Sequence, residues 1–235
     1  MSKRNIALLT DYYELLMMEG YFDLSKAKKA EEQIVTFDVF YRVNPFSNGF
    51  AVFCGLNEII DYIENLKFTD EDIEFLKQNG TFTEEFLNYL KGFRFTGSIF
   101  AFEEGSIINK KEPIIKVVAP ISEAQLIESA MLCIFNHETL IATKAYRICE
   151  AARPGNVMEF GLRRAMSFDS AIYGAKAACI AGCIGTSNVL TAKLYNLPAL
   201  GTMAHSWIMS FDDELTAFKE FAKRYPNMCI LLVDT

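Results

Sequence analysis

The amino-acid sequence predicts an α/β protein, with an N-terminal α+β domain at residues 1–152 and the first half of an irregular (β/α) barrel at residues 153–235. Two observations support this fold class and its division. Helical and strand patterns are mixed irregularly before residue 153, whereas short apolar strands alternate with helices after it. Hydrophobic residues make up 51% of the chain and charged residues 23%, an ordinary globular composition that supplies enough apolar material for a core.

The first part contains amphipathic helical patterns and strand patterns rich in β-branched and aromatic residues. Its expected elements are, in order, a helix at 11–22, a strand at 34–41, helices near 54–66 and 69–78, strands within 97–120, and a helix at 122–152. Thr69 to Asp72 has the composition of a capping box, which predicts where one of these helices begins. The last helical pattern predicts one break, near Asn136.

The second part has a βαβαβαβ order, which predicts parallel strands joined by crossover helices. Its expected strands lie at 156–160, 183–185, 198–201 and 228–233, and its expected helices at 169–181, 188–195 and 212–225. Four such units make about half of an eight-stranded barrel. A buried parallel strand needs neighbours on both sides, and the chain stops directly after the fourth strand. We therefore expect a barrel that is truncated there, with its other half missing from this chain.

Charge and patterning exclude two broad classes of function. The net charge is −7, whereas a general nucleic-acid binder is usually basic. No run reaches the roughly 18 apolar residues that span a bilayer, so we expect no membrane contact and a cytoplasmic protein. The six cysteines lie among apolar residues and are interpreted as reduced core side chains. Cys179 and Cys183 have no His or acidic residue nearby to complete a ligand set, so no metal site is predicted.

Aromatic, cationic and polar side chains follow the four predicted strands of the second part. In chain order they are Phe160 and Arg163, Thr186 and Ser187, His205, and Asp234. Functional residues of barrels lie just beyond the C-terminal ends of strands, so we expect these side chains to line one rim. Each also has a structural interpretation, as a core ring, a solvated cation, a helix cap or a satisfied polar group. Their convergence at strand ends favours a function.

Several segments together resemble the motifs of nicotinate phosphoribosyltransferases and, more distantly, those of nicotinamide phosphoribosyltransferase. They are TDYY (10–13), FYRVNP (40–45), EFGLRRA (159–165), GTSNV (185–189) and GTMAHSW (201–207). These motifs cover essentially the whole chain. They also stand in the order and at the spacing of that family.

The resemblance implies an enzyme of pyridine nucleotide and NAD biosynthesis by salvage. It would join nicotinate to 5-phosphoribosyl-1-pyrophosphate, giving nicotinate mononucleotide and pyrophosphate. ATP is the co-substrate, and its hydrolysis is coupled through a phosphohistidine, so that the enzyme counts as both a ligase and a glycosyltransferase. Mg²⁺ accompanies phosphoribosyl pyrophosphate. A homodimer with its active site at the subunit interface is also implied.

Residue roles follow from the same resemblance. His205 corresponds to the histidine that ATP phosphorylates, and Asp234 to the aspartate that orients it. An imidazole is nucleophilic when it is neutral and held in one tautomer by a partner.

Other positions correspond to substrate contacts. Phe160 and Tyr13 would sandwich the pyridine ring, with Tyr13 arriving from the neighbouring subunit. Arg163 would face anionic groups of the ligand, and Arg42 would contact a phosphate. Thr186 and Ser187 would surround the carboxylate of nicotinate. Ser187 favours the acid, because the nicotinamide enzyme has an aspartate at this place, and that side chain would repel a carboxylate.

Alternatives and departures accompany this interpretation. Met166 stands where the family pattern has a Gln, and the chain contains no glycine-rich phosphate loop of the kind that precedes a helix. One alternative is a non-catalytic or split N-terminal fragment that needs a separate C-terminal half, and the isolated chain is then expected to be inactive. Another is a quinolinate phosphoribosyltransferase, against which the AHSW motif at 204–207 argues.

Overall fold

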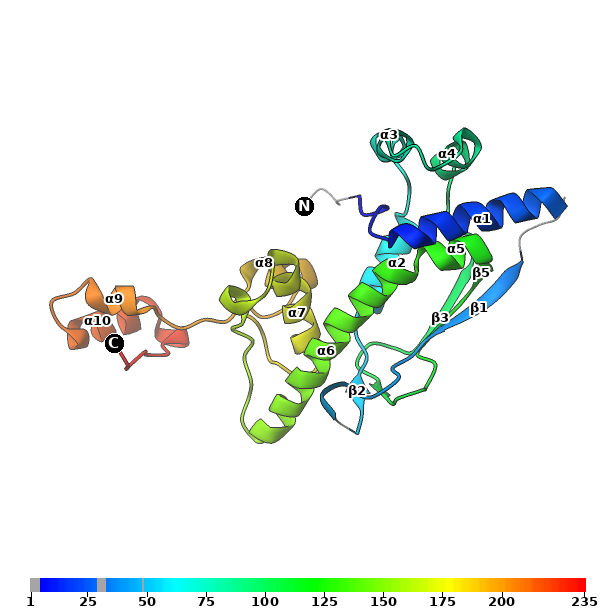
Figure 1. Ribbon diagram of the computed structural model, residues 1–235. Helices are drawn as coiled ribbons and strands as arrows, with labels where there is room; N and C mark the ends of the chain where they lie inside the picture. Colours follow the sequence, from blue (N-terminus) through cyan, green and yellow to red (C-terminus); the bar gives the residue numbers. More distant parts are fainter. Residues whose placement is uncertain (1–4, 29–32, 48) are drawn as a thin grey trace.

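The computed structural model describes residues 5–28, 33–47 and 49–235. It is a mixed α/β structure with a broad N-terminal portion and a smaller C-terminal portion at the opposite end (Figure 1). Among the described residues, none of the helices combines the length and the apolar character that crossing a bilayer requires.

Two antiparallel sheets form in the N-terminal portion. The larger has the order β1-β5-β3, and the smaller pairs β2 with β4. The strands are β1 (Ile34–Val39), β2 (Ala51–Val52), β3 (Ser98–Ala101), β4 (Ile107–Ile108) and β5 (Ile115–Pro120). Val117 of β5 lies opposite Phe37 on one side and Ile99 on the other. The alternating β-branched and aromatic residues of β1 explain this placement, because such side chains pack well on a half-buried pleated surface.

Six helices accompany these sheets in the described part of the N-terminal portion. They are α1 (Tyr12–Lys28), α2 (Leu56–Glu64), α3 (Asp70–Gln78), α4 (Glu84–Lys91), α5 (Ile121–Leu126) and α6 (Glu128–Ala152). The helix α1 packs on α5, and α3 packs on α4. The predicted helices are confirmed, whereas α4 was not foreseen. The predicted break near Asn136 is wrong, because the chain turns at Ile127 and residue 136 lies inside α6.

The capping box predicted for α3 is present. The side chain of Thr69 accepts from the backbone N–H of Asp72, and the Asp72 carboxylate accepts from the backbone N–H of Thr69 at 2.7 Å. Two donors that the helix cannot satisfy internally are thereby paired.

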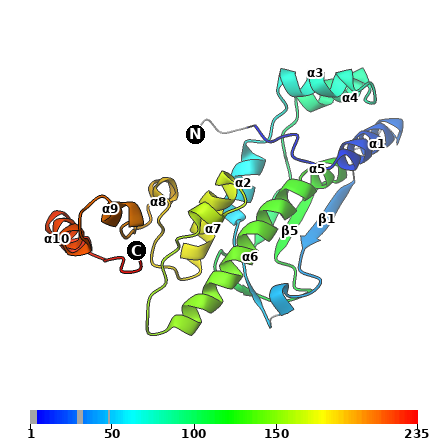
Figure 2. The same ribbon diagram turned by 60° about the vertical axis from the view of Figure 1, so that its left-hand side comes forward.

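The main core is built almost entirely from the N-terminal portion. Its largest fully buried side chains include Phe53, Phe86 and Phe135. A second, smaller cluster joins α6 to α7 (Phe168–Ile180) through small residues such as Ala142 and Ala177. These alanines let the two helices approach closely, and Figure 2 shows α7 lying along α6. The sequence boundary expected after residue 152 falls where α6 ends.

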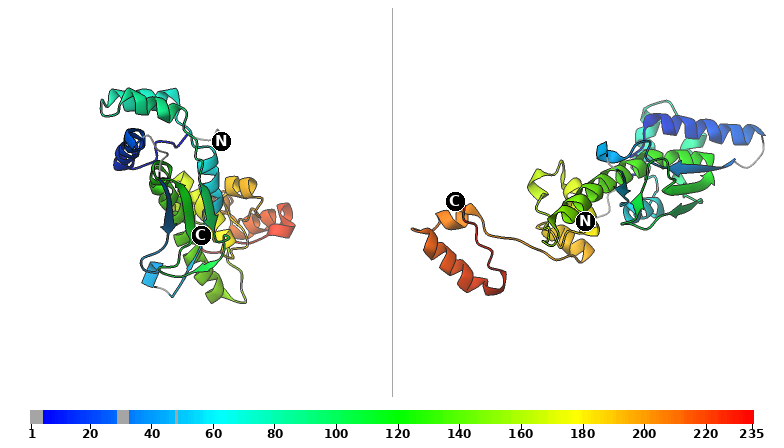
Figure 3. Two further views of the ribbon diagram at one scale, coloured as in Figure 1. Left: turned by 90° about the vertical axis from the view of Figure 1, so that its right-hand side faces the viewer. Right: turned by 90° about the horizontal axis from the view of Figure 1, so that it is seen from below.

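The remaining helices are α8 (Val189–Tyr195), α9 (His205–Met209) and α10 (Glu214–Arg224). The helices α9 and α10 pack against each other and lie apart from the rest of the structure, beyond an extended segment that follows α8 (Figures 1 and 3). Their shared core is small, with Met203, Ile208 and Ala217 as its buried members. Short 3₁₀ turns occur at Pro45–Ser47, Leu162–Arg164 and Pro226–Met228.

The four parallel strands expected in the second part are reduced to two parallel bridges. Glu159 pairs with Thr186, and Thr186 pairs with Ala199, so the first three segments are parallel neighbours in chain order. The fourth predicted strand, at 228–233, is not formed. A parallel strand needs neighbours, and Leu232 instead packs on the small core beside α9 and α10. The structure is thus α/β, and the described residues build no continuous barrel sheet.

Candidate active site

The first two predicted strand ends lie side by side. The backbone N–H of Glu159 donates to Gly185 O at 2.9 Å, and the N–H of Ser187 donates to Glu159 O at 3.0 Å. The turn that follows Glu159 exposes two of the predicted substrate contacts, with Phe160 44% exposed and Arg163 in the 3₁₀ turn. Phe160, Arg163 and Ser187 are therefore carried by adjacent backbone segments, as the strand-end pattern predicts.

The two hydroxyl residues of the second strand end have different environments. Thr186 is 0% exposed, and its hydroxyl donates to the Glu159 carboxylate at 2.5 Å. Ser187 is only partly covered. The helix cap proposed for Ser187 is wrong, because Asn188 holds that position and its side-chain oxygen accepts from Thr191 N at 3.3 Å. Ser187 thus keeps its hydroxyl free of any capping bond within α8.

The last two predicted residues meet at the C-terminal end of the chain. His205 opens α9, and its Nε2 lies 3.9 Å from the Asp234 carboxylate, too far for a hydrogen bond. Its Nδ1 lies 3.1 Å from the hydroxyl of Thr235, which the sequence did not single out. The side chains of His205 and Asp234 are 52% and 79% exposed. The imidazole is therefore accessible to solvent.

Tyr13 and Arg42 lie elsewhere in the fold. Tyr13 is exposed in the first turn of α1, and Arg42 is exposed just after β1. Within the described part of the chain, neither Tyr13 nor Phe160 stacks on another aromatic ring, and Arg42 has no ion-pair partner. Exposure of Tyr13 at the surface fits a side chain that reaches outward rather than one that completes a site within its own chain.

The predicted single rim is therefore divided into two groups. Glu159 and Thr186 hold together the segments that carry Phe160, Arg163 and Ser187. His205, Asp234 and Thr235 form the other group, in the separate portion around α9 and α10. No hydrogen bond or ion pair between described residues joins the two. The predicted single rim is not formed because the chain continues beyond the bridge at Ala199 along the extended segment, which carries His205 away from the first group.

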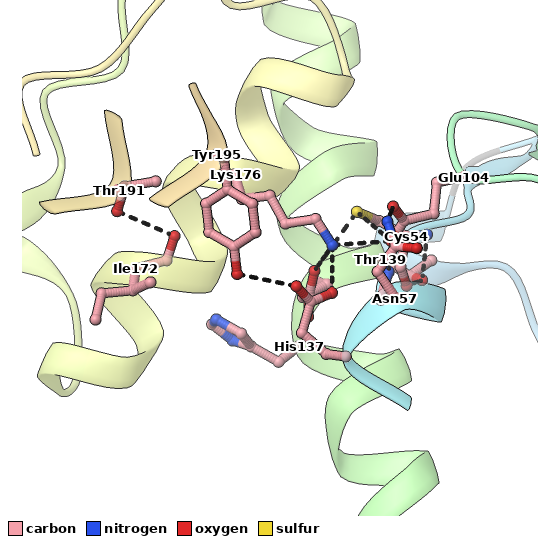
Figure 4. Close-up of polar contacts among 12 residues, drawn as sticks. Cys54, Asn57, Glu104, His137, Thr139, Ile172, Lys176, Thr191 and Tyr195 are labelled. Carbon is pink, nitrogen blue, oxygen red and sulfur yellow. Dashed lines mark hydrogen bonds and ion pairs between the residues drawn. The ribbon is translucent and has the colours of Figure 1, made fainter. Parts of the chain in front are cut away.

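A buried charge cluster, which sequence reasoning missed, joins α7 to the N-terminal portion (Figure 4). Lys176 is 4% exposed and forms ion pairs with three carboxylates, those of Glu58, Glu104 and Glu138. The distances to Glu104 and Glu138 are 3.0 and 3.2 Å. The phenol of Tyr195 donates to Glu58 at 2.9 Å. A lysine inside an alanine-rich helix was the available sequence signal, since a buried ammonium requires partners.

The cluster has a strongly perturbed titration. Burial, followed by the charge of Glu58, raises the pKa of Glu138 to about 8. Burial alone would lower the pKa of Lys176, but Glu138 and Glu58 outweigh it and hold that pKa above its ordinary value. Three carboxylates face one ammonium, so a proton on Glu138 relieves part of the excess negative charge.

Cys54, Glu104 and Glu138 are spaced closely enough for a metal ligand set. The Lys176 ammonium already lies against both carboxylates. Burial also raises the pKa of the Cys54 thiol, which keeps it protonated. The Lys176 ammonium therefore occupies the position in which a metal cation would contact these carboxylates. His137, on the neighbouring face of α6, lies 3.3 Å from Ser170 O and is a polar contact.

Two family models match this chain. Residues 8–136 match the model of the nicotinate phosphoribosyltransferase N-terminal domain, and residues 156–231 match the nicotinate phosphoribosyltransferase family. The chain is 46% identical to a nicotinate phosphoribosyltransferase of Bacillus subtilis over 98% of its own length and 46% of that protein. It is 40% identical to one of Mycobacterium tuberculosis over 97% of its own length and 48% of that protein.

Two solved structures share the fold of this chain. The crystal structure of human nicotinic acid phosphoribosyltransferase superposes with a TM-score of 0.77 at 30% identity, over 86% of this chain and 40% of that one. A nicotinate-nucleotide pyrophosphorylase from Pyrococcus furiosus superposes with a TM-score of 0.73 at 26% identity, over 93% of this chain and 47% of that one. The chain spans about half the length of the curated relatives it matches. With both family models matched in order along its length, this chain belongs to the nicotinate phosphoribosyltransferase family.

Proposed function

We propose that this chain supplies the nicotinate-binding and phosphate-accepting residues of a cytoplasmic nicotinate phosphoribosyltransferase of NAD salvage. The reaction joins nicotinate to 5-phosphoribosyl-1-pyrophosphate, releases pyrophosphate and is coupled to ATP hydrolysis. The observation that carries the proposal is the pairing of Glu159 with Thr186, because it sets an exposed aromatic ring, an arginine and a serine on adjacent segments.

Nicotinate binding is assigned to this first group. Phe160 offers one face for the flat pyridine ring, and a second ring strengthens such a contact. Tyr13 supplies that second ring from the partner of a homodimer. Arg163 offers paired N–H donors to anionic groups, and Ser187 offers a hydroxyl donor to the carboxylate of nicotinate. Arg42 remains a candidate phosphate contact. The buried hydroxyl of Thr186 takes no part in direct contact.

Phosphate acceptance is assigned to His205. Its Nε2, as the lone-pair nitrogen of a neutral imidazole, attacks the γ-phosphorus of ATP, and the bond to the bridging oxygen breaks so that ADP leaves. The contact between Nδ1 and Thr235 holds the ring in place. Asp234 lies beside Nε2 and stabilises the ring when it carries positive charge. Mg²⁺ enters with the phosphates of the substrate. In the first group both carboxylate oxygens of Glu159 already accept hydrogen bonds from the protein.

The test is product formation. The purified chain is incubated with nicotinate, phosphoribosyl pyrophosphate, ATP and Mg²⁺, alone and with the unmatched part of the Bacillus subtilis relative added as a separate polypeptide. We expect nicotinate mononucleotide in the second mixture. Product in the first mixture would show that the residues of this chain suffice.

A matched control uses the corresponding fragment of the Bacillus subtilis relative with the same added polypeptide. If that mixture forms product and both mixtures with this chain do not, the proposed function is wrong. The control thereby separates a failure to reassociate from the absence of activity.

A further inference from the structure

Glu159 binds both edges of the proposed nicotinate site at once. One oxygen of its carboxylate accepts from the N–H of Gly161, in the turn that carries Phe160 and Arg163. The other accepts from the hydroxyl of Thr186, on the segment that carries Ser187. Its backbone adds two further bonds to that segment, through Gly185 O and the N–H of Ser187. One residue thus sets the relative position of the two segments.

Thr186 extends this contact toward α8. Its hydroxyl proton is given to Glu159, so its oxygen is free to accept, and it accepts from Asn188 N at 2.9 Å. Asn188 in turn caps α8 and donates from its side chain to Ala171 O at 3.3 Å. Ser187 therefore lies between two residues whose side chains are fixed. The position of its backbone therefore depends on Glu159, in the adjacent segment.

The two members of this pair differ in exposure. Thr186 is completely buried, whereas Glu159 is partly buried and each of its carboxylate oxygens already accepts one hydrogen bond from the protein. Ligand contact falls to the neighbours that remain accessible, Phe160, Arg163 and Ser187. Glu159 would therefore hold the ligand-contacting residues in position without itself touching the substrate.

We infer that Glu159 is a positioning residue for nicotinate recognition, acting through the Thr186 hydroxyl and the Gly161 amide. This inference rests on the proposed function of the site. It predicts that the carboxylate, rather than the size of the side chain, is what matters. In Glu159→Gln the amide nitrogen can only donate, so either the Gly161 N–H or the Thr186 hydroxyl loses the acceptor that the carboxylate provides.

The experiment compares Glu159→Gln, Thr186→Val and the double variant with Glu112→Gln. Glu112 is a matched control, because its carboxylate accepts from Asn109 N at 2.9 Å in an exposed turn remote from the site. In whichever mixture the unchanged chain is active, we expect Glu159→Gln to raise KM for nicotinate about tenfold, the factor that about 1.4 kcal/mol of lost hydrogen bonding gives. KM for ATP should stay constant. The double variant should add little, because the two residues act as one unit.

Amide hydrogen exchange gives a readout that needs no activity. In Glu159→Gln we expect the N–H groups of Ser187 and Asn188 to exchange about tenfold faster, with α6 unchanged. Unaltered exchange at both positions, or a nicotinate KM no different from that of Glu112→Gln, would overturn the inference. If the unchanged chain makes no product although the Bacillus subtilis control does, the proposed function fails, while the exchange result still decides whether Glu159 positions these segments.

Discussion

The buried junction of α6 and α7 and the C-terminal portion of α9 and α10 are held together in very different ways. At the junction Lys176 and Glu138 are buried, and Lys176 is paired with Glu138 and with the largely covered carboxylates of Glu58 and Glu104. Around α9 and α10 the buried core comprises Met203, Ile208 and Ala217, while large side chains such as Met209 and Val233 are 75% exposed. Regions with few buried contacts open at lower free energy than densely packed ones. Nicotinate recognition and phosphate acceptance are thus assigned to portions of unequal stability.

Removal of the Lys176 charge should lower the stability of the junction, and this should be the largest of the expected effects. Lys176→Met leaves the buried Glu138 and the largely covered Glu58 and Glu104 without their cation. Removing one partner of a buried ion pair costs about 3–5 kcal/mol of unfolding free energy. Denaturant unfolding measures it, and loss of a cooperative transition is the extreme form of the same result. Lys193→Met, at an exposed position of α8, is the control. A Lys176 variant as stable as that control would show that the junction does not depend on its charges.

Ser187 and His205 should separate the two chemical tasks. Ser187→Asp places a carboxylate where nicotinate carries one, and like charges in contact cost several kcal/mol. We expect kcat/KM for nicotinate to fall on the order of a hundredfold, with labelling of the protein by radioactive ATP retained. His205→Ala should abolish the labelling and leave the equilibrium affinity for nicotinate intact. Unchanged nicotinate kinetics in Ser187→Asp would contradict the assignment of that residue.

Glu138 should make the free energy of unfolding of the junction depend on pH, in contrast to that of the C-terminal portion. Its folded-state pKa of about 8 lies above the ordinary value of 4.5, so the folded chain retains the proton longer than the unfolded chain. Its stabilising contribution is present in full below pH 4.5 and is lost as pH rises through about 8. The slope for one proton is about 1.4 kcal/mol per pH unit.

Urea unfolding at several pH values between these limits measures that slope. Glu138→Gln carries no charge at any pH and should flatten the dependence. Glu150→Gln, at the exposed end of the same helix, should leave it unchanged. Equal slopes in the two variants would mean that another group holds the proton.

Trp207 should have the smallest effect on global stability. Its indole N–H donates to Ala217 O at 3.0 Å and links α9 to α10. Trp207→Phe should change the global unfolding free energy by no more than about 0.5 kcal/mol, because α9 and α10 open before the main core. Amide exchange in α10 should nevertheless accelerate relative to Tyr225→Phe. A large fall in global stability would show that the C-terminal portion unfolds together with the junction.

Local patterns predicted local structure well. Thr69 and Asp72 form the expected cap, β1 follows its alternating residues, and the alanine-rich pattern after residue 168 forms α7. The strand expected at 228–233 failed because a parallel strand depends on partners that lie elsewhere in sequence. The turn at Ile127 was missed because helical periodicity continues across it.

Pairings between distant residues could not be predicted from the sequence. The ion pair between Lys176 and Glu58 spans 118 positions, and no periodicity connects them. Glu159 stood inside a recognised motif, but its contact with Thr186 follows only from the bridge between their segments. The strand-end rule nevertheless selected Phe160, Arg163 and Ser187 correctly as neighbours in space. It placed His205 and Asp234 together as well, but assigned both groups to one rim.

During synthesis on the ribosome, Glu58, Glu104 and Glu138 emerge before Lys176. Until α7 appears, closing that face of the nascent chain would bury three acidic groups without their counter-charge. We therefore expect hydration of these groups to keep the face open while the main core forms from earlier residues. We expect α7 to dock onto this partly folded precursor once Lys176 has emerged.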